Sequence, residues 1–559
     1  MAVSKFGIFI FCHIHILSLT TANSKDGYDR YKALLPKTQG MPWPLPFQMT
    51  SSEDQLFIDK DRFVFNLDQR CDILSYAFKR YTDIIFGADD STVSQTKRFS
   101  NRNAHQKTVF EFAIPRPLRD DDVVTALHVD VQGQCMDDEY PSLQSDESYN
   151  LQINPNGFAT LDAKQVWGAL RGLETFSQLI YNNDDGAFVI NVTSITDKPR
   201  FQHRGILLDS SRHFLSVNVL KKNLDVMAMN KINVFHWHIV DGTSFPYESY
   251  TFPDMSAMSA YTRKEVYSQE DIKDLIEYAR LRGIRIIPEF DSPGHSESWG
   301  PANPGLLTKC FTAGKWDGSF GPIDPSSNIT YPFLTQFFTE ISQVFKDQYI
   351  HLGGDEVSFD CWKSNPDVNA FMTRMGFPND YSKLEEYYMT KLLQIVDSAK
   401  RNYIIWQEVV DNNVTVAANT VVEVWKGEYQ KEMAAVTAKG YKVLLSSPWY
   451  LDYISYGKDW YKYYLADPQD FNGTQEQYDL VMGGEACLWG EFVDDTNVLS
   501  RLWPRASPIA ERLWSPIGTF DVKSAEMRLD EHRCRMVKRG YPAQPIDGPG
   551  FCPHEFVQK

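Results

Sequence analysis

The sequence predicts an α/β protein: a (β/α)₈ TIM barrel catalytic domain preceded by a smaller α+β domain. Three observations predict the barrel. Eight short apolar runs alternate with helical stretches after residue 200, the runs are apolar throughout, as in parallel strands buried on both faces, and polar or aromatic residues follow each run. We divide the chain into residues 1–22, 23–200 and 201–559, which are a signal peptide, the α+β domain and the barrel with a C-terminal tail.

The signal peptide is predicted from charge and length. Lys5 precedes an apolar run over residues 6–19, and small residues at 20–22 suit cleavage. A membrane span needs about 20 apolar residues, so we expect no membrane span here or later in the chain. The mature protein is expected in the secretory pathway, in the lysosome or secreted. Sequons predict glycosylation there at Asn191, Asn328, Asn413 and Asn472.

Composition excludes other classes of protein. The 559 residues are 43% apolar and 23% charged, as in globular proteins, which excludes intrinsic disorder. The net charge is 56 − 73 = −17, which repels phosphate backbones, so we expect no nucleic-acid partner.

The α+β domain is predicted from hydrophobic periodicity. Residues 109–114 and 126–131 alternate as half-buried strands do, and residues 166–181 carry apolar side chains at helical spacing. This pattern ends near Lys198 and Pro199.

The barrel is predicted from its runs and from the helices between them. One helix is expected over 268–282, where Ser268 and Asp271 form a capping box, and another over 382–400. The alternative, a doubly wound open sheet, lacks the G-x-G-x-x-G opening. The eight strands are expected at residues 205–208, 233–240, 285–290, 349–352, 403–406, 421–425, 442–445 and 480–484.

The runs end in residues that a plain loop does not need. Active sites of barrels lie at the carboxyl ends of the strands. The residues at these ends are Asp209, Arg212, His213, His236, His238, Asp241, Glu289, Asp291, His295, Asp355, Glu356, Trp406, Trp425, Trp449, Tyr450, Asp452, Glu485, Trp489 and Glu491. Carboxylates with aromatic walls and no phosphate-binding glycine loop predict sugar recognition.

Asp355 and Glu356 are candidates for acid–base chemistry. Because they are adjacent, mutual repulsion and burial are expected to keep one of them protonated in mild acid, as a general acid must be. They follow Gly353 and Gly354, which allow a close backbone approach.

Two other hydrolase types are less favoured. His236 and His238 share one strand face and could bind a metal with His295, Asp241 and Asp355. A strand histidine can equally donate to a neighbouring carboxylate, and acidic pH weakens imidazole ligands, so we expect neither a metal nor another cofactor. A serine hydrolase is disfavoured because residues 294–298 lack the second glycine of the nucleophile elbow.

Cysteine count predicts one free thiol. Removal of Cys12 with the signal leaves 8 − 1 = 7 cysteines, an odd number. Cys487, between apolar neighbours, is expected to be buried and inert. Cys534 and Cys552 would close the C-terminal tail into an 18-residue loop.

Four ordered motifs resemble glycoside hydrolase family 20, and among its members the animal lysosomal-type β-N-acetylhexosaminidases. The motifs are His203-Arg-Gly-Ile-Leu-Leu-Asp-Ser-Ser-Arg-His213, Phe235-His-Trp-His-Ile-Val-Asp241, Glu289-Phe-Asp-Ser-Pro-Gly-His295 and His351-Leu-Gly-Gly-Asp-Glu356. The resemblance covers nearly the whole chain. It implies a retaining, exo-acting enzyme that removes terminal β-linked GlcNAc or GalNAc from glycoconjugates, with the substrate's 2-acetamido group as nucleophile and an oxazolinium intermediate.

The resemblance also implies the role of each site residue. Asp355 would orient the acetamido group, and Glu356 would protonate the leaving oxygen and then deprotonate water. Asp241 and His295 would tune Glu356. Arg212, Asp452 and Glu491 would hold ring hydroxyls, Trp406, Trp425 and Trp489 would wall the acetamido pocket, and Tyr450 would donate to the acetamido oxygen. The implied disulfides are Cys71–Cys135, Cys310–Cys361 and Cys534–Cys552.

Specificity and assembly are further expectations. Asp452 matches the family's neutral-substrate type, so 6-sulfated sugars should be repelled, although the next residue, Tyr453, matches neither known type. Tyr456 resembles a residue that contacts the partner's site, so a homodimer or heterodimer is expected. An inactive glycan-binding protein on the same scaffold stays an alternative, disfavoured by intact Asp355, Glu356 and Tyr450.

Overall fold

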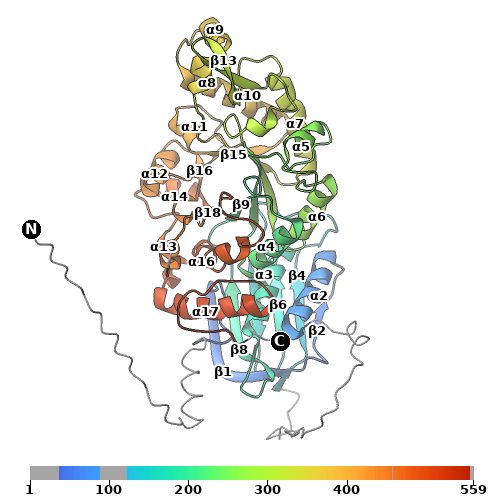
Figure 1. The fold of residues 1–559 in the computed structure, drawn as a ribbon. Coiled ribbons are helices and arrows are strands. Elements are labelled where there is room, and N and C mark those ends of the chain that lie inside the picture. Colours follow the sequence, from blue (N-terminus) through green and yellow to red (C-terminus); the bar gives the residue numbers. More distant parts are fainter. Residues whose placement is uncertain (1–36, 88–121, 456, 554–559) are drawn as a thin grey trace, which may run out of the picture.

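A computed structural model of the chain describes residues 37–87, 122–455 and 457–553. The predicted signal peptide, the strand expected at 109–114 and Tyr456, which was expected to contact a partner, lie outside these residues. In Figure 1 the N-terminal sheet lies at the lower end, the barrel in the middle, and a hairpin with helices α8 and α9 at the upper end.

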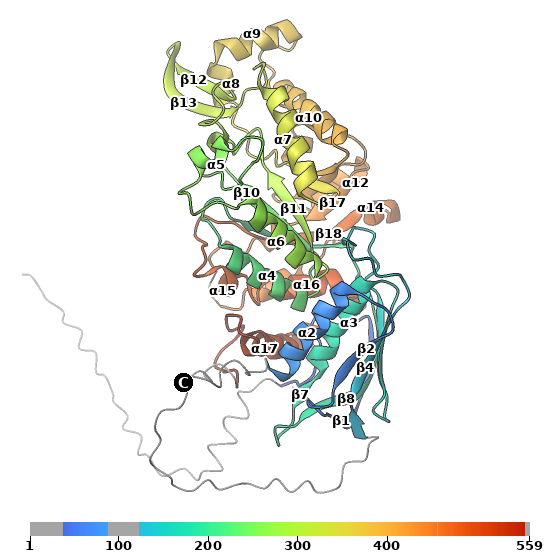
Figure 2. The same ribbon diagram turned by 90° about the vertical axis from the view of Figure 1, so that its right-hand side faces the viewer.

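The N-terminal part is one mixed sheet with two helices lying beside it (Figure 2). The sheet order is β2-β4-β6-β5-β8-β1-β3, with β7 paired to β8. The strand expected at 126–131 and the helix expected at 166–181 are confirmed as β4 and α3. The elements are β1 (Gln48–Ile58), β2 (Val64–Leu67), α2 (Asp72–Phe86), β3 (Val123–Val124), β4 (Ala126–Val131), β5 (Tyr149–Ile153), β6 (Ala159–Ala163), α3 (Val166–Leu179), β7 (Tyr181–Asn182) and β8 (Phe188–Asp197).

Eight parallel strands then close into the predicted barrel. Every expected run forms one of its strands, because each is apolar enough to be buried between the barrel interior and the surrounding helices. The strands are β9 (His203–Asp209), β10 (Val234–Val240), β11 (Arg285–Phe290), β14 (Tyr349–His351), β15 (Asn402–Trp406), β16 (Val421–Val424), β17 (Lys442–Leu445) and β18 (Val481–Leu488).

Helices follow the strands and cover the barrel. Ser268 and Asp271 form the predicted capping box before α6. In the described part of the chain, no helix combines the length and hydropathy needed to cross a bilayer. The helices are α4 (Val217–Met229), α5 (Asp254–Ser259), α6 (Gln269–Arg280), α7 (Thr330–Val344), α8 (Asp360–Ser364), α9 (Pro366–Met375), α10 (Tyr381–Ser398), α11 (Glu408–Asp411), α12 (Tyr429–Ala438), α13 (Trp460–Leu465), α14 (Gln475–Asp479), α15 (Val498–Leu502), α16 (Ser507–Trp514) and α17 (Val522–Lys538), with 3₁₀ turns η2 (Glu297–Trp299), η3 (Ser447–Trp449) and η4 (Ile517–Thr519).

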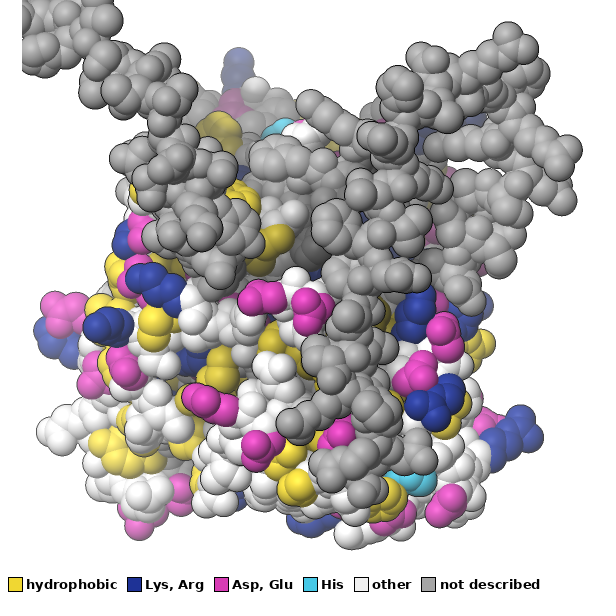
Figure 3. Space-filling view, turned by 90° about the horizontal axis from the view of Figure 1, so that it is seen from below, with side chains coloured by type: hydrophobic (Ala, Val, Ile, Leu, Met, Phe, Trp, Pro, Cys, Tyr) yellow, Lys and Arg dark blue, Asp and Glu magenta, His cyan; other side chains and the backbone are white. Residues whose placement is uncertain are grey.

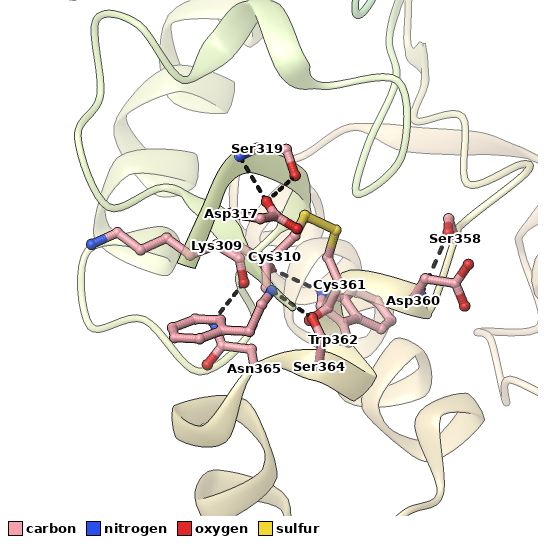
Figure 4. Close-up of a disulfide and its surroundings, with 12 residues drawn as sticks. Lys309, Cys310, Asp317, Ser319, Ser358, Asp360, Cys361, Trp362, Ser364 and Asn365 are labelled. Carbon is pink, nitrogen blue, oxygen red and sulfur yellow. Dashed lines mark hydrogen bonds between the residues drawn. A yellow bond between two sulfur atoms is a disulfide. The ribbon is translucent and has the colours of Figure 1, made fainter. Parts of the chain in front are cut away.

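A hairpin of β12 (Leu307–Thr312) and β13 (Lys315–Ile323) is inserted between β11 and β14. The disulfide Cys310–Cys361 ties it to α8, as Figure 4 shows. Nearby, the Asn365 side-chain amide donates to the Lys309 carbonyl across 3.0 Å. Cys71–Cys135 and Cys534–Cys552 are also bonded, and Cys487 is buried and free, which matches the implied pairing.

Buried ion pairs join the N-terminal sheet to the amino-terminal ends of the barrel strands. Lys231, after α4, lies 2.8 Å from Asp197 at the end of β8. Arg204 of β9 lies 2.7 Å from Glu147 of the N-terminal part. These pairs fix the orientation of the barrel on the sheet, since an unpaired buried charge would be costly.

On the face seen from below, acidic and basic side chains of the described residues are interspersed (Figure 3).

Candidate active site

A cavity of about 480 Å³ opens at the carboxyl ends of the barrel strands. Of the predicted site residues, only Asp241 and Trp406 are not part of its wall. The cavity is lined by Arg212, His295, Asp355, Glu356, Trp425, Tyr450, Asp452, Tyr453, Ile454, Trp489, Glu491, Phe492 and Val493. Sequence reasoning did not assign Ile454, Phe492 or Val493 to the site, although each lies within two residues of Asp452 or Glu491, so chain proximity was the available signal.

A larger cavity of about 910 Å³ lies elsewhere, where α2 and the end of α17 approach the start of the barrel. Three carboxylates line it, but each is neutralised by a basic partner: Asp83 by Lys79, Glu174 by Arg539 and Asp225 by Arg282. The smaller cavity is therefore the candidate active site, because it combines aromatic walls with Asp355 and Glu356, which approach His295 rather than a lysine or arginine.

Asp355 and Glu356 lie in the loop that follows β14. Gly353 before them has φ +67°, and a Cβ atom there would lie 1.7 Å from Asp291 Oδ1, which confirms the close backbone approach. The Gly354 amide donates to the same oxygen across 2.9 Å. Glu356 and His295 also have positive φ, of 49° and 50°. Such backbone strain in residues other than glycine is characteristic of functional sites.

The two carboxyl groups differ in environment. Asp355 is buried, whereas the Glu356 side chain is 59% exposed. Burial raises the pKa of Asp355, and the charge of Glu289 adds to the increase. Burial and then the charge of Asp355 raise the pKa of Asp291 well above its ordinary value. The expectation that Asp355 and Glu356 repel each other is therefore corrected, since Glu356 is exposed to solvent. The charge that adds to the pKa of Asp355 is that of Glu289, and a hydrogen bond with Asp291 acts in the opposite direction.

Asp241 lies behind the cavity wall and holds two of its residues. Its Oδ2 atom is 2.7 Å from Arg212 and 3.3 Å from His295 Nδ1. Burial alone would raise the pKa of Asp241, but hydrogen bonds from His238 and His295 keep it below its ordinary value. His295 Nε2 lies 3.5 Å from Glu356 Oε2. Burial would lower the pKa of His295, but Asp241, Asp291 and Asp355 raise it to about 10.

Aromatic rings form the floor and sides of the cavity. Trp425 and Tyr450 are stacked with their centroids 6.1 Å apart, and the Arg212 guanidinium lies 5.1 Å from the Trp489 ring. Trp406 is buried behind them, 6.5 Å from Trp425 and 6.1 Å from Trp489. Burial raises the pKa of Tyr450 well above its ordinary value, so this tyrosine is a neutral hydroxyl donor.

Asp452 also lines the cavity. Burial, followed by the charge of Glu491, raises its pKa to about 6. Its Oδ1 atom is buried without a hydrogen-bond partner. Buried polar atoms are nearly always paired, so this oxygen is available to a polar group of a ligand.

The histidines that suggested a metal contact carboxylates instead. His236 lies 2.8 Å from Glu485 and 3.0 Å from Glu289. His238 lies 2.6 Å from Glu289 and 2.9 Å from Asp241. These contacts fit the alternative interpretation of a strand histidine, although His236 Nε2 approaches Glu289 without making a hydrogen bond.

The four sequons differ in exposure. Asn328, Asn413 and Asn472 are exposed. Asn191 is half-buried in β8, where it accepts a hydrogen bond from the Tyr181 hydroxyl across 2.8 Å.

Comparisons with known proteins identify the family. Residues 201–517 match the model of the glycosyl hydrolase family 20 catalytic domain, and residues 42–179 match a model described as β-acetyl hexosaminidase like. The chain is 50% identical over 521 residues to β-hexosaminidase subunit β of Felis catus, covering 92% of this chain and 94% of that protein. It is 47% identical over 527 residues to β-hexosaminidase subunit α of Bos taurus, covering 92% and 95%. The X-ray structure of Flavobacterium johnsoniae chitobiase superposes with a TM-score of 0.74 at 29% identity, over 89% of this chain and 72% of that one.

A barrel with paired carboxylates and an aromatic pocket defines a glycoside hydrolase. The chain belongs to glycosyl hydrolase family 20. It is a β-N-acetylhexosaminidase that acts by substrate-assisted catalysis with retention of configuration.

Proposed function

We propose that Asp355 and Glu356 divide the chemistry of this enzyme between them. The acetamido oxygen of the substrate attacks the anomeric carbon, the glycosidic bond breaks, and Glu356 gives its proton to the leaving oxygen. Glu356 then takes a proton from the water that attacks the same carbon and opens the oxazolinium ring, which restores the acetamido group. The single observation that carries the proposal is that both carboxyl groups line the same cavity as Tyr450, Trp425 and Trp489.

Asp355 is proposed to accept the acetamido N–H and to stabilise the positive charge of the intermediate. The support is its burial and its unpaired Oδ1 atom. A buried carboxylate is costly without a partner, and the cationic intermediate supplies one. Electrostatic interactions of this kind increase as the transition state is reached.

Ring hydroxyls and the acetamido methyl have separate partners in this proposal. Arg212, Asp452 and Glu491 hold hydroxyls, and the Trp425, Trp489 and Trp406 cluster encloses the methyl group. Asp241 and His295 tune Glu356 through the 3.5 Å approach of His295.

The proposal is tested with two chromogenic substrates that differ only at carbon 2. We expect an N-acetyl-β-glucosaminide to be hydrolysed, and the matching β-glucoside, which has no acetamido nucleophile, to be hydrolysed more slowly by a factor on the order of 10³ or more. A thiazoline mimic of the intermediate should inhibit competitively. Comparable rates on both substrates, or a glycosyl ester trapped on a carboxylate, would show that the mechanism is wrong. Absence of turnover of either substrate would favour the inactive glycan-binding protein.

Asp452 is proposed to select against 6-sulfated sugars in a pH-dependent way. Because its pKa is about 6, it is neutral below that pH and repels a sulfate only above it. We expect the ratio of kcat/KM for the neutral to the 6-sulfated substrate to rise roughly tenfold between pH 4.5 and 7.5. In Asp452→Asn this rise should be lost. A ratio that stays constant with pH in the wild type would contradict the assignment.

We also propose that the enzyme dimerises and is delivered to the lysosome or secreted. The curated relatives are named as subunits, and Tyr453, Ile454 and Phe492 at the cavity mouth are 63%, 81% and 76% exposed, which suits an interface. A monomer in sedimentation at micromolar concentration would argue against the dimer. Release of mass by an N-glycosidase would support passage through the secretory pathway.

A further inference from the structure

One carboxylate inside the barrel has an unusual set of neighbours. Glu289 of β11 is fully buried. Its Oε1 atom accepts a hydrogen bond from the Trp406 indole across 2.8 Å and lies 3.2 Å from His351 Nδ1. Its Oε2 atom is 2.6 Å from His238 Nδ1 and 3.0 Å from His236 Nε2. Glu289 itself does not line the cavity, so its contacts act on the site only through other residues.

The first of these contacts leads to the acetamido pocket. Trp406 packs behind Trp425 and Trp489, which line the cavity. The indole N–H has one acceptor, the Glu289 carboxylate. A ring fixed by a charge-assisted hydrogen bond cannot rotate without leaving its buried N–H unpaired. Glu289 therefore fixes the ring against which the pocket walls pack.

The second contact leads to the acid–base residue. His238 Nδ1 lies 2.6 Å from Glu289, and its Nε2 lies 2.9 Å from Asp241. Burial would raise the pKa of both carboxyl groups, but contacts with histidines keep both below their ordinary values. Both groups are therefore ionised and can only accept, so both ring nitrogens donate. A histidine that donates from both nitrogens is an imidazolium. Asp241 in turn holds His295, whose Nε2 atom lies 3.5 Å from Glu356. Glu289 therefore keeps His238 protonated, and His238 is linked to Glu356 through Asp241 and His295.

We infer that Glu289 is a positioning residue that sets both the acetamido pocket wall, through Trp406, and the orientation of Glu356, through His238, Asp241 and His295. The inference rests on the roles proposed above for Glu356 and the pocket. It also rests on geometry that is independent of catalysis, namely the contacts of the His238 ring with charged groups. Three charged groups face that imidazole: Glu289, Asp241 and the Arg212 guanidinium, whose nitrogen lies 3.3 Å from Nε2.

The electrostatics agree with this geometry. Burial would lower the pKa of His238, but Glu289 and Asp241 raise it to about 10. Its proton is thus retained at every pH below that value, and activity should show no ionisation of His238 in mild acid. Without the Glu289 charge, the pKa should fall to about the ordinary histidine value of 6.5 or lower, and the proton is lost as pH rises through it.

The test compares Glu289→Gln with the matched substitution Glu340→Gln. Glu340 of α7 is also buried and also accepts from several donors, including the Tyr247 and Ser249 hydroxyls, but it lies outside the site. We expect Glu289→Gln to lower kcat/KM by about 10²-fold, with the larger share in kcat, and to add a new ionisation near pH 6 to the pH profile. His236 and His351 also face Glu289, so NMR of the variant must assign this ionisation to His238. Glu340→Gln should alter neither property. The conservative Glu289→Asp should keep His238 protonated and so should not add the ionisation.

The wild-type enzyme supplies a readout that needs no variant to fold. Nitrogen-resolved NMR of His238 should show a doubly protonated ring from pH 5 to 8. A wild-type titration midpoint near pH 6.5 would overturn the inference, as would a folded Glu289→Gln enzyme with wild-type kcat and pH profile. If Glu356→Gln retained full activity while His238 stayed protonated, the proposed role of Glu356 would fail and the contacts of Glu289 would not.

Discussion

Replacing Glu356 by Gln is expected to lower kcat by about 10³-fold on substrates with poor leaving groups. The amide can neither protonate the leaving oxygen nor take a proton from water. An aryl substrate with an acidic leaving group should lose less, because its departure needs little protonation, and the second step then limits the rate. Added azide should partly restore turnover of that substrate and yield a β-glycosyl azide, since azide opens the oxazolinium ring without a base.

The control for this variant is Glu428→Gln, the same change at an exposed glutamate paired with Lys431. It should be fully active. Because the Glu356 side chain is 59% exposed, thermal unfolding of Glu356→Gln should match the wild type. Retention of more than a tenth of the wild-type kcat on a poor-leaving-group substrate would remove Glu356 from the proposed role.

Replacing Asp355 by Asn is expected to lower kcat/KM by a factor on the order of 10³, because the variant has no charge to stabilise the cationic intermediate. A thiazoline mimic should bind at least tenfold more weakly to this variant. Azide should not rescue it, which separates its defect from that of Glu356→Gln. Normal affinity for the mimic would contradict the role of Asp355.

Stability should change in the opposite direction to activity. The pKa of Asp355 is raised in the folded protein, so its ionisation destabilises the fold as pH rises above the value of the unfolded chain. Asn cannot ionise and also lies against Asp291 without repulsion. The melting temperature of Asp355→Asn relative to wild type should therefore increase with pH, and a difference that falls with pH would exclude this burial effect.

Much of the barrel could be predicted from the sequence, because its strands are short, apolar throughout and separated by helices. Strands such as β10 and β11 are buried on both faces, and that environment is visible in composition alone. The N-terminal sheet was harder to predict from the sequence. Most of β1 is exposed and polar, so its place between β8 and β3 follows from pairing with distant strands that no local pattern reveals.

The candidate site shows the same division. Its residues could be found because each follows a barrel strand, and the carboxyl ends of parallel strands meet. The charge states of these residues could not be predicted, because the groups that surround a carboxyl group in space come from distant parts of the chain. Glu356, next to Asp355 in the chain, is exposed to solvent, whereas the carboxyl group that interacts with Asp355 belongs to Asp291, which follows β11.

The sequence by itself determined the barrel, the residues at its strand ends and the family to which the chain belongs. Only the tertiary structure decided which of these residues line the cavity and which, like Asp241 and Glu289, act from behind it. The physical reason is that strand composition reports burial, which is a local property. Protonation and orientation depend on side chains that barrel closure brings together from distant strands.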